Sequence, residues 1–193
     1  MEIKYLDEIK AAIALKPRHF VTWQDVEAVI QQETSGVPIF NPNETLYKLN
    51  LLSAENLADL PPAVIKQSVT IIQGPLEGKI CKFRMEPGYW RWADSQTGLD
   101  IQLRVLLACS LGVGQKMARW LITNVPKYQW GNVIRHFMAD VPTQLLYVAG
   151  DLDNLLLQSE GDRLLAYTRY NAGAGAKTVS KYGRDVFNVF EEI

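Results

Sequence analysis

The chain has 193 residues, which is enough for one domain or for one domain with a sizeable insertion. Hydrophobic residues make up 48% and charged residues 21%, as in an ordinary soluble globular protein, and the net charge of -1 gives nucleic-acid binding no electrostatic support. No apolar run approaches the roughly 20 residues of a membrane span, and the histidines and cysteines lack metal-ligand spacing. We therefore expect no membrane span, no nucleic-acid partner, no metal and no cofactor.

The first segment, residues 1–16, is expected to form an amphipathic helix. Ile3, Leu6 and Ile9 recur at helical spacing, and Pro17 follows and cannot continue the helix. The segment also carries acidic residues and has no uninterrupted apolar core, unlike a secretory signal peptide. We therefore expect synthesis in the cytoplasm without a Sec-type export route.

A second helix is predicted to begin at Thr22 and to end near Glu33. Thr22 and Asp25 have the spacing of a capping box, with Asp in place of the usual Glu. A Ser-Gly pair and then Pro38 follow Glu33 and act as stop signals. Glu33 is therefore expected at the C-terminal end of a helix that carries an apolar stripe.

The next part of the chain changes from helical to strand-like patterning. Residues 41–62 are rich in turn and cap residues and predict loops with short helices. Residues 68–73 are β-branched and apolar, and residues 79–86 alternate between polar and apolar side chains. The glycine-bounded segment 74–78 separates the two, so the pattern predicts a β-hairpin.

From residue 101 onward the pattern is helical again. Gly112 and Gly114 interrupt it, and residues 171–175 predict a turn of small residues. The predicted helices cover residues 101–108, 115–123, 132–138, 143–157, 162–170 and 178–192. We therefore predict a mainly α protein of the α+β kind, in which a helical domain carries one small β-hairpin.

Glu33 is the candidate catalytic residue that this pattern favours. Cleavage of a glycosidic bond needs a proton donor, and a carboxylic acid serves near neutral pH when its surroundings raise its pKa. The unpaired carbonyls at a helix C-terminus disfavour a nearby negative charge and act in that direction. A second carboxylate usually faces the acid across the cleft. Glu86, near the end of the second predicted strand, is the candidate for that position.

Three short motifs occur in an order that resembles one known family. Residues 25–36 end in Glu-Thr-Ser-Gly and are followed by Asn41-Pro42, residues 110–115 read Ser-Leu-Gly-Val-Gly-Gln, and residues 169–175 read Arg-Tyr-Asn-Ala-Gly-Ala-Gly. Together they resemble the motifs of lytic transglycosylases and goose-type lysozymes, in which a helix ends in the catalytic Glu. Thr34 stands where that family usually has Ser.

A narrower match lies between the first two motifs. Residues 83–90, Phe-Arg-Met-Glu-Pro-Gly-Tyr-Trp, resemble a segment of phage and prophage members in which Glu-Pro lies among aromatic residues. The resemblance as a whole covers most of residues 22–190. The first and second motifs are farther apart than is usual in the family. The extra length falls at about residues 43–72, which we interpret as an insertion.

The resemblance implies a single lysozyme-like catalytic domain over residues 1–193, with the hairpin beside an active-site cleft. The implied activity is cleavage of the β-1,4 bond between N-acetylmuramic acid and N-acetylglucosamine in peptidoglycan, by lytic transglycosylase or muramidase chemistry. Glu33 is expected to act as general acid and base, and Glu86 to position or activate water. The residues expected to bind the glycan are Ser110, Gly112, Gln115, Tyr170, Asn171, Tyr89 and Trp90.

Several alternatives remain open at this point. The long gap between the first two motifs allows an alignment in which Glu86 is itself the acid. A non-catalytic glycan-binding or structural component of a virion or tail, on the same fold, is a second candidate, and a helical interaction protein with coincidental motifs is a third. By resemblance, we expect the protein to act on the periplasmic cell wall, as a phage endolysin or as a lysin carried with other virion or tail proteins.

Overall fold

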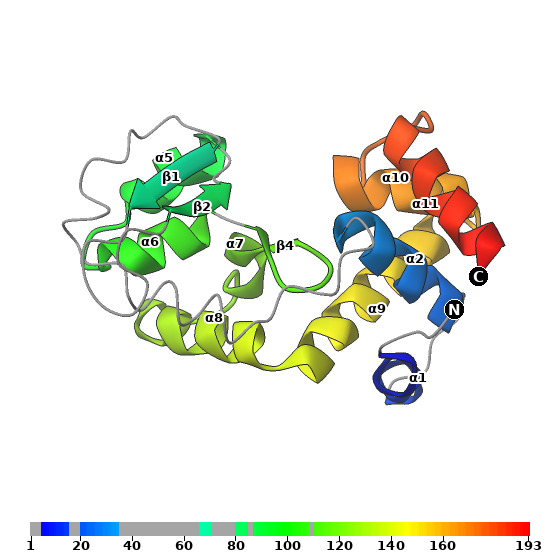
Figure 1. Cartoon of the computed structure of the whole chain (residues 1–193), viewed down its shortest axis with the longest axis horizontal. Helices are drawn as coiled ribbons and strands as arrows, with labels where there is room; N and C mark the ends of the chain where they lie inside the picture. The colour runs from blue at the N-terminus through cyan, green and yellow to red at the C-terminus, as the bar shows by residue number, and fades with distance from the viewer. Residues whose placement is uncertain (1–4, 16–19, 35–65, 71–79, 85–86, 109) are drawn as a thin grey trace. The chain divides into compact units, whose positions relative to one another are not determined.

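The computed structural model describes residues 5–15, 20–34, 66–70, 80–84, 87–108 and 110–193, and most of these residues are helical (Figure 1). This confirms the predicted mainly α class with a small antiparallel sheet. The chain divides into two compact units. Unit 1 comprises Met1–Ile39 and Val141–Ile193, and unit 2 comprises Phe40–Asp140. Most of the predicted insertion at 43–72 lies outside the described residues, and the single lysozyme-like domain stays a prediction.

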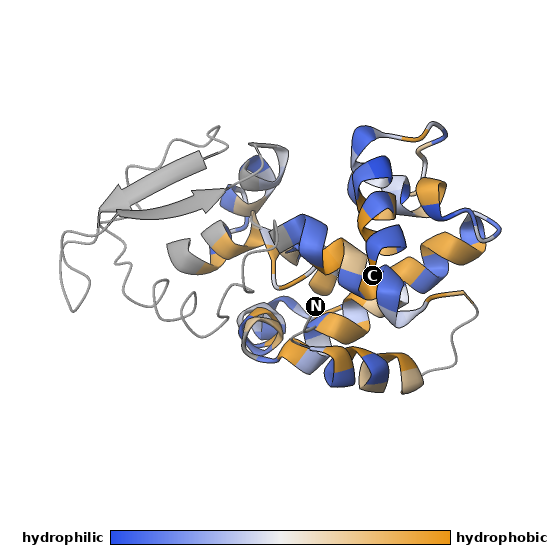
Figure 2. Cartoon of the chain, turned by 45° about the vertical axis from the view of Figure 1, so that its right-hand side comes forward, coloured by the Kyte–Doolittle hydropathy of each residue, from blue (hydrophilic) through white to orange (hydrophobic). Residues whose placement is uncertain are grey.

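Unit 1 is a cluster of helices, and each of them was expected from the sequence. Its described helices are α1 (Leu6–Ala14), α2 (Trp23–Thr34), α9 (Val141–Gln158), α10 (Arg163–Ala172) and α11 (Lys181–Glu192). Apolar and polar residues alternate along them at helical spacing, as the mixed colouring in Figure 2 shows. The apolar faces meet in a core in which Val29, Leu152 and Val186 are fully buried.

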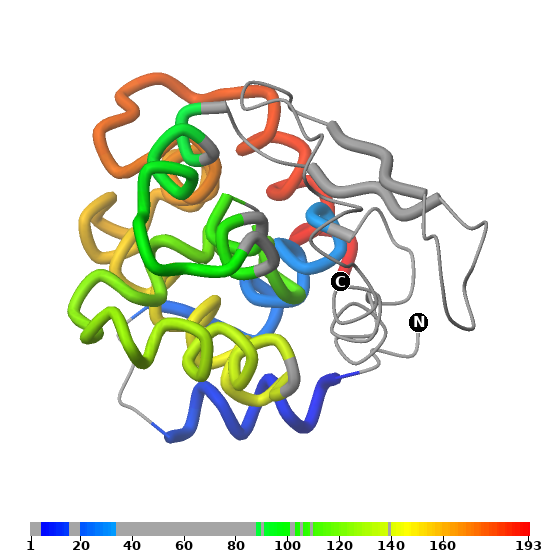
Figure 3. The backbone as a smooth tube through the Cα atoms, turned by 90° about the vertical axis from the view of Figure 1, so that its left-hand side faces the viewer, coloured from blue at the N-terminus to red at the C-terminus, as the bar shows by residue number. Residues whose placement is uncertain are grey.

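The helices of unit 1 pack in a definite order of neighbours. Helix α2 contacts α1, α9 and α11, and α10 contacts both α9 and α11. Helix α1, which Figure 3 draws lengthwise in dark blue, packs against α9. This packing brings the end of α2 into the same cluster as α10 and α11, although more than a hundred residues of chain separate them.

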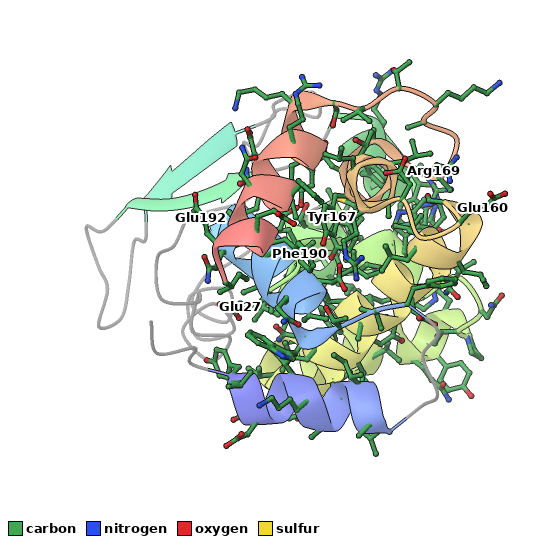
Figure 4. All side chains as sticks on the ribbon, turned by 90° about the vertical axis from the view of Figure 1, so that its right-hand side faces the viewer. Glu27, Glu160, Tyr167, Arg169, Phe190 and Glu192 are labelled. Atoms are coloured by element: carbon green, nitrogen blue, oxygen red, sulfur yellow. The ribbon has the colours of Figure 1, made fainter. Side chains whose placement is uncertain are left out.

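The start of α2 is held by the predicted capping pair and by a buried carboxylate. The Thr22 amide and hydroxyl both donate to Asp25 Oδ2 at 2.7 Å, and the Asp25 amide donates to Thr22 Oγ1 at 3.4 Å. Fully buried Asp25 also accepts hydrogen bonds from Arg163 Nε at 2.8 Å and from the Tyr167 hydroxyl at 2.6 Å. Figure 4 shows Tyr167 and Phe190 facing one another, with ring centroids 6.4 Å apart. These contacts fix α2 against α10 and α11.

Helices α10 and α11 approach closely at a glycine. A Cβ atom added to Gly183 would come within 2.7 Å of the Leu164 carbonyl oxygen and would also overlap the Thr168 hydroxyl. Ser180 caps α11 by accepting a hydrogen bond from the Gly183 amide at 3.1 Å, and its own amide donates to Thr168 Oγ1 at 3.0 Å. Only glycine fits at this contact, so the residue sets the distance between the two helices.

Unit 2 combines short helices with two small hairpins. Strands β1 (Lys66–Thr70) and β2 (Ile80–Arg84) pair antiparallel, with Thr70 opposite Ile80 and Lys66 opposite Arg84. This confirms the predicted hairpin. The elements that follow are α5 (Pro87–Asp94), α6 (Ile101–Leu107), β3 (Ser110–Leu111), β4 (Lys116–Met117), α7 (Ala118–Leu121), the 3-10 helix η1 (Lys127–Gln129) and α8 (Trp130–Ala139).

The helices of unit 2 enclose their own apolar core. Leu107 and Ile134 are fully buried in it, and Phe137 and Met138 are nearly so. Trp92 and Trp130 pack against this core while remaining partly exposed. The core therefore depends on side chains of α6 and α8, with the aromatic residues at its edge.

The structure corrects the predicted helices in three places. Helix α5 was not predicted, although Pro87 occupies the first helical position that proline favours. The helix expected over 115–123 begins only at Ala118, because Gln115 lies in the turn between β3 and β4 with a φ of 49°. Asn171, expected in a turn, belongs to the last turn of α10. Within the described part of the chain, no helix is long and apolar enough to span a membrane.

Candidate functional site

Glu33 lies at the end of α2, one residue before its last residue, Thr34. Its side chain is half-buried. The Tyr182 hydroxyl of α11 donates a 2.6 Å hydrogen bond to Glu33 Oε1. The carboxyl group is thus near the negative end of a helix dipole and is oriented by a phenol. The side chain is therefore held by a hydrogen bond, and part of the residue remains exposed.

Tyr182 reaches Glu33 because α11 is amphipathic. Tyr182, Val186 and Phe190 recur every four residues and therefore share one face of the helix. Val186 is fully buried, so this face points toward the other helices of unit 1. Burial raises the pKa of Tyr182 far above its ordinary value, and the negative charge and hydrogen bond of Glu33 raise it further. The phenol therefore stays a hydrogen-bond donor across the physiological range.

Tyr170 and Asp151 complete this arrangement. Tyr170 lies on α10 and is half-buried. Burial raises the pKa of Tyr170 well above its ordinary value, and the negative charges of Asp151, on α9, and Glu33 add to this effect. We refer to Glu33, Asp151, Tyr170 and Tyr182 as the Glu33 site. Its four side chains come from four different helices, and all of them belong to unit 1.

The end of α10 that carries Tyr170 is anchored by Arg169. The guanidinium donates to the carbonyl oxygens of Ala176 and Gln158, each at 3.0 Å, and to Ser159 Oγ at 2.8 Å. Arg169 is labelled in Figure 4. These bonds connect the segment after α10 to the end of α9. Asn171, two positions after Arg169, is exposed and so is available to a ligand from solvent.

The residues of the second motif lie in the β3–β4 hairpin of unit 2. Ser110 is half-buried in β3, and its hydroxyl donates to Met117 Sδ at 3.2 Å. Gly112 has a φ of 73°, a backbone conformation that glycine adopts at little cost. Gln115 is exposed, and its side-chain amide donates to the Gly112 carbonyl at 2.9 Å. The three residues therefore belong to one short hairpin, and Gln115 makes a hydrogen bond within its turn.

The other predicted site residues have different outcomes. Tyr89 lies on α5, half-buried against the core of unit 2. Trp90 lies on the same helix, and its side chain is outside the described part of the structure. Glu86 and the Asn41-Pro42 pair are also outside the described residues. The structure thus brings Glu33 and Tyr170 together within unit 1, and the roles expected for all of these residues stay predictions.

Two members of the Glu33 site were missed by the sequence analysis. Tyr182 is marked only by the four-residue spacing of Tyr182, Val186 and Phe190, which identifies a buried face and not a partner for Glu33. Asp151 sits in a helix whose apolar residues dominate its pattern. Both become visible only when α2, α9, α10 and α11 are packed.

Among the residues that the structure describes, no three or more His, Cys, Asp or Glu side chains are grouped so that they could hold a metal ion. Comparison with known proteins identifies no relative, since no family model matches the chain and neither a curated protein nor a solved structure matches it.

Proposed function

We propose that this chain cleaves the β-1,4 bond between N-acetylmuramic acid and N-acetylglucosamine in peptidoglycan, with Glu33 as the general acid. The observation that carries the proposal is that the negative charge of Glu33 acts on Tyr170 and raises the pKa of its phenol. These residues belong to the first and third motifs of the resemblance, and helix packing alone brings them together. A coincidental match would give no reason for the two to meet.

The surroundings of Glu33 suit proton transfer in both directions. A proton donated to the leaving oxygen leaves a carboxylate, and the Tyr182 hydroxyl at 2.6 Å stabilises that charge. The same carboxylate can then accept a proton from the attacking hydroxyl. In a lytic transglycosylase this hydroxyl is the muramic 6-hydroxyl, which closes a 1,6-anhydro ring. In a hydrolase it belongs to water.

The second carboxylate in this scheme has two candidates. Glu86 was expected from the sequence, and Asp151 is added by the structure because its charge acts on Tyr170 together with that of Glu33. Asp151 is half-buried on α9. The binding roles proposed for Ser110, Gly112 and Gln115 rest on the resemblance.

A non-catalytic glycan-binding or virion component remains the second candidate function. It is favoured by the same Tyr182–Glu33 hydrogen bond, because such a bond also serves simply to join α2 to α11.

The two functions differ in one measurable respect. Purified peptidoglycan is incubated with the protein and the soluble products are analysed by mass spectrometry. Products with 1,6-anhydro ends support a transglycosylase, products with reducing ends support a hydrolase, and retention on peptidoglycan with no products supports the binding protein.

A further inference from the structure

Unit 2 contains a pocket of about 220 Å³ that shares no residue with the Glu33 site. It is lined by Trp92, Arg119, Trp120, Ile122, Thr123 and Trp130. These residues come from α5, from α7 and the segment after it, and from the start of α8. Aromatic rings make up half of its lining, so the pocket offers large apolar surfaces to a ligand.

Two of the tryptophans are held in place and the third is exposed. The rings of Trp92 and Trp130 lie 6.0 Å apart, tilted by 35°, and the Trp130 indole donates to the Val125 carbonyl at 2.8 Å. Trp120 is 55% exposed. Covering an indole ring that is this exposed removes apolar surface from water, which favours binding of a ligand. The pocket therefore has a rigid wall and one free stacking face.

Arg119 supplies the charge of the pocket. Its guanidinium carbon lies 4.6 Å from the ring centre of Trp92 and 6.0 Å from that of Tyr89. Within the described part of the chain, these ring contacts are the interactions of the guanidinium, and no carboxylate or carbonyl accepts its N–H groups. Stacking orients a guanidinium while leaving its in-plane N–H donors available. Such donors match the two oxygens of a carboxylate.

We infer that this pocket binds a sugar ring that bears a carboxylate. The apolar C–H face of the ring stacks on Trp120, and Arg119 binds the carboxylate. A tryptophan alone would accept any apolar group, and an arginine alone any anion, but the two together in one small pocket select a ligand that has both features. The choice of a muramyl sugar as this ligand rests on the proposed function, because the lactyl group of muramic acid carries a carboxylate.

The test separates the sugar from its charge. The full chain, with its tryptophan side chains labelled with ¹⁵N, is titrated with N-acetylmuramic acid, N-acetylglucosamine or lactate. Indole N–H signals report binding, after assignment by single Trp→Phe variants. N-acetylmuramic acid is expected to shift the Trp120 and Trp92 signals at lower concentrations than either other compound. Arg119→Gln should weaken its binding about fivefold and leave N-acetylglucosamine binding unchanged. Trp120→Ala should weaken the binding of both sugars about tenfold.

Matched controls are available on the same unit. Tyr128 is 82% exposed and does not line the pocket, so Tyr128→Ala should leave both affinities unchanged. Arg91 is exposed on α5 and is also outside the lining, so Arg91→Gln controls for a general loss of positive charge. Circular dichroism and unfolding curves of all four variants show which of them fold.

Several results would overturn the inference. One is the absence of any shift at Trp120 and Trp92 with N-acetylmuramic acid. A second is equal binding of the two sugars in the wild type, which would mean that the carboxylate is not recognised. A third is tighter binding of uridine monophosphate than of N-acetylmuramic acid, which would make the ligand a different anion. A fourth is self-association that Trp120→Ala abolishes, which would make the pocket a contact between copies of the chain. Glu33→Gln should keep the binding. If the wild type digests peptidoglycan but its pocket binds no sugar, the inference about the pocket is wrong and the proposed function stands. If the pocket binds the sugar but the protein does not digest peptidoglycan, the inference stands and the proposed function is wrong.

Discussion

The Tyr182 hydroxyl on α11 donates a 2.6 Å hydrogen bond to Glu33 Oε1 at the end of α2. The two residues are separated by most of the chain, and both are half-buried. This bond links a helix end, where a negative charge is disfavoured, to a donor that stabilises the charged carboxylate. The helix end favours the protonated carboxyl group, and the hydrogen bond favours the carboxylate. A group that both donates and accepts a proton requires both forms to be accessible.

Replacing Tyr182 by Phe tests whether this bond serves catalysis as well as stability. The variant removes one hydrogen bond to a charged group and should lower the free energy of unfolding by about 1–2 kcal/mol. If Glu33 is the acid, kcat should fall about tenfold with little change in KM. The variant disturbs the orientation of Glu33 but removes none of the groups that bind the substrate. Tyr128→Phe, on the exposed surface of unit 2, is the control for loss of a phenol hydroxyl. Unchanged kcat with reduced stability would assign the bond a structural role alone.

Alkaline pH should destabilise the protein through three phenols, of which Tyr167 is buried and Tyr170 and Tyr182 are half-buried. Burial and carboxylate neighbours raise the pKa of Tyr167, Tyr170 and Tyr182 above the usual value of about 10. The folded state therefore keeps protons that the unfolded chain releases above about pH 10. Stability from these groups is complete below that pH and declines as the pH rises further, by up to about 1.4 kcal/mol per pH unit for each phenol.

Denaturant unfolding curves at increasing pH measure this decline. Tyr182→Phe should reduce its steepness, because one of the phenols that releases a proton on unfolding is absent. Phenolate absorbance should rise in a step that coincides with unfolding. A free energy of unfolding that stays constant or increases above about pH 10 contradicts the assignment.

Gly183→Ala should destabilise unit 1 through the contact between α10 and α11. The new methyl group would meet the Leu164 carbonyl oxygen and the Thr168 hydroxyl, and both are held by helix geometry or hydrogen bonds. We expect a loss of about 1–3 kcal/mol, as for other overpacked contacts. Gly175→Ala is the matched control, since nothing lies within 4 Å of its added Cβ. Equal unfolding midpoints for the two variants would show that the helices can separate at no cost.

Asp25→Ala should cost more than any surface charge replacement. It leaves the buried Tyr167 hydroxyl and the partly exposed Arg163 guanidinium without their acceptor in unit 1. Removal of one partner of a buried pair typically costs about 3–5 kcal/mol. Asp185→Ala breaks the i,i+4 pair of Asp185 with exposed Lys181 and should cost about 0.5 kcal/mol or less. Chemical denaturation distinguishes these losses readily, and comparable losses would mean that the Asp25 pair is not the connection between α2 and α10.

Local patterns were sufficient to predict most helices and the first hairpin. The Thr22–Asp25 pair predicted the start of α2, and alternation over 79–86 predicted β2, because capping and pleating depend on neighbours in sequence. The pattern failed where backbone geometry overrides composition. Gln115 fits a helix by residue type, yet the turn after Gly112 requires it to take a positive φ. The predicted strand ended at residue 86 and no helix was predicted after it, although proline at position 87 favours the first position of a helix.

The candidate site was only partly predictable for a different reason. Glu33 and Tyr170 were found from short motifs, which are continuous in sequence. Tyr182 and Asp151 have no such motif, and their proximity to the others depends on how α2, α9, α10 and α11 pack. The partner of a carboxylate across a helix interface follows from tertiary contacts, which the periodicity of one helix does not contain.

The most direct test of the central claim is the initial rate of peptidoglycan digestion by Glu33→Gln, measured beside wild type and Glu86→Gln. Glu192→Gln, which alters an exposed carboxylate on α11, is the control. Glutamine keeps the size of the side chain and cannot donate the proton, so Glu33→Gln should reduce the rate by about 100-fold or more, Glu86→Gln should reduce it less, and Glu192→Gln should retain the wild-type rate. Full activity in Glu33→Gln, with none in Glu86→Gln, would contradict the assignment and make Glu86 the acid.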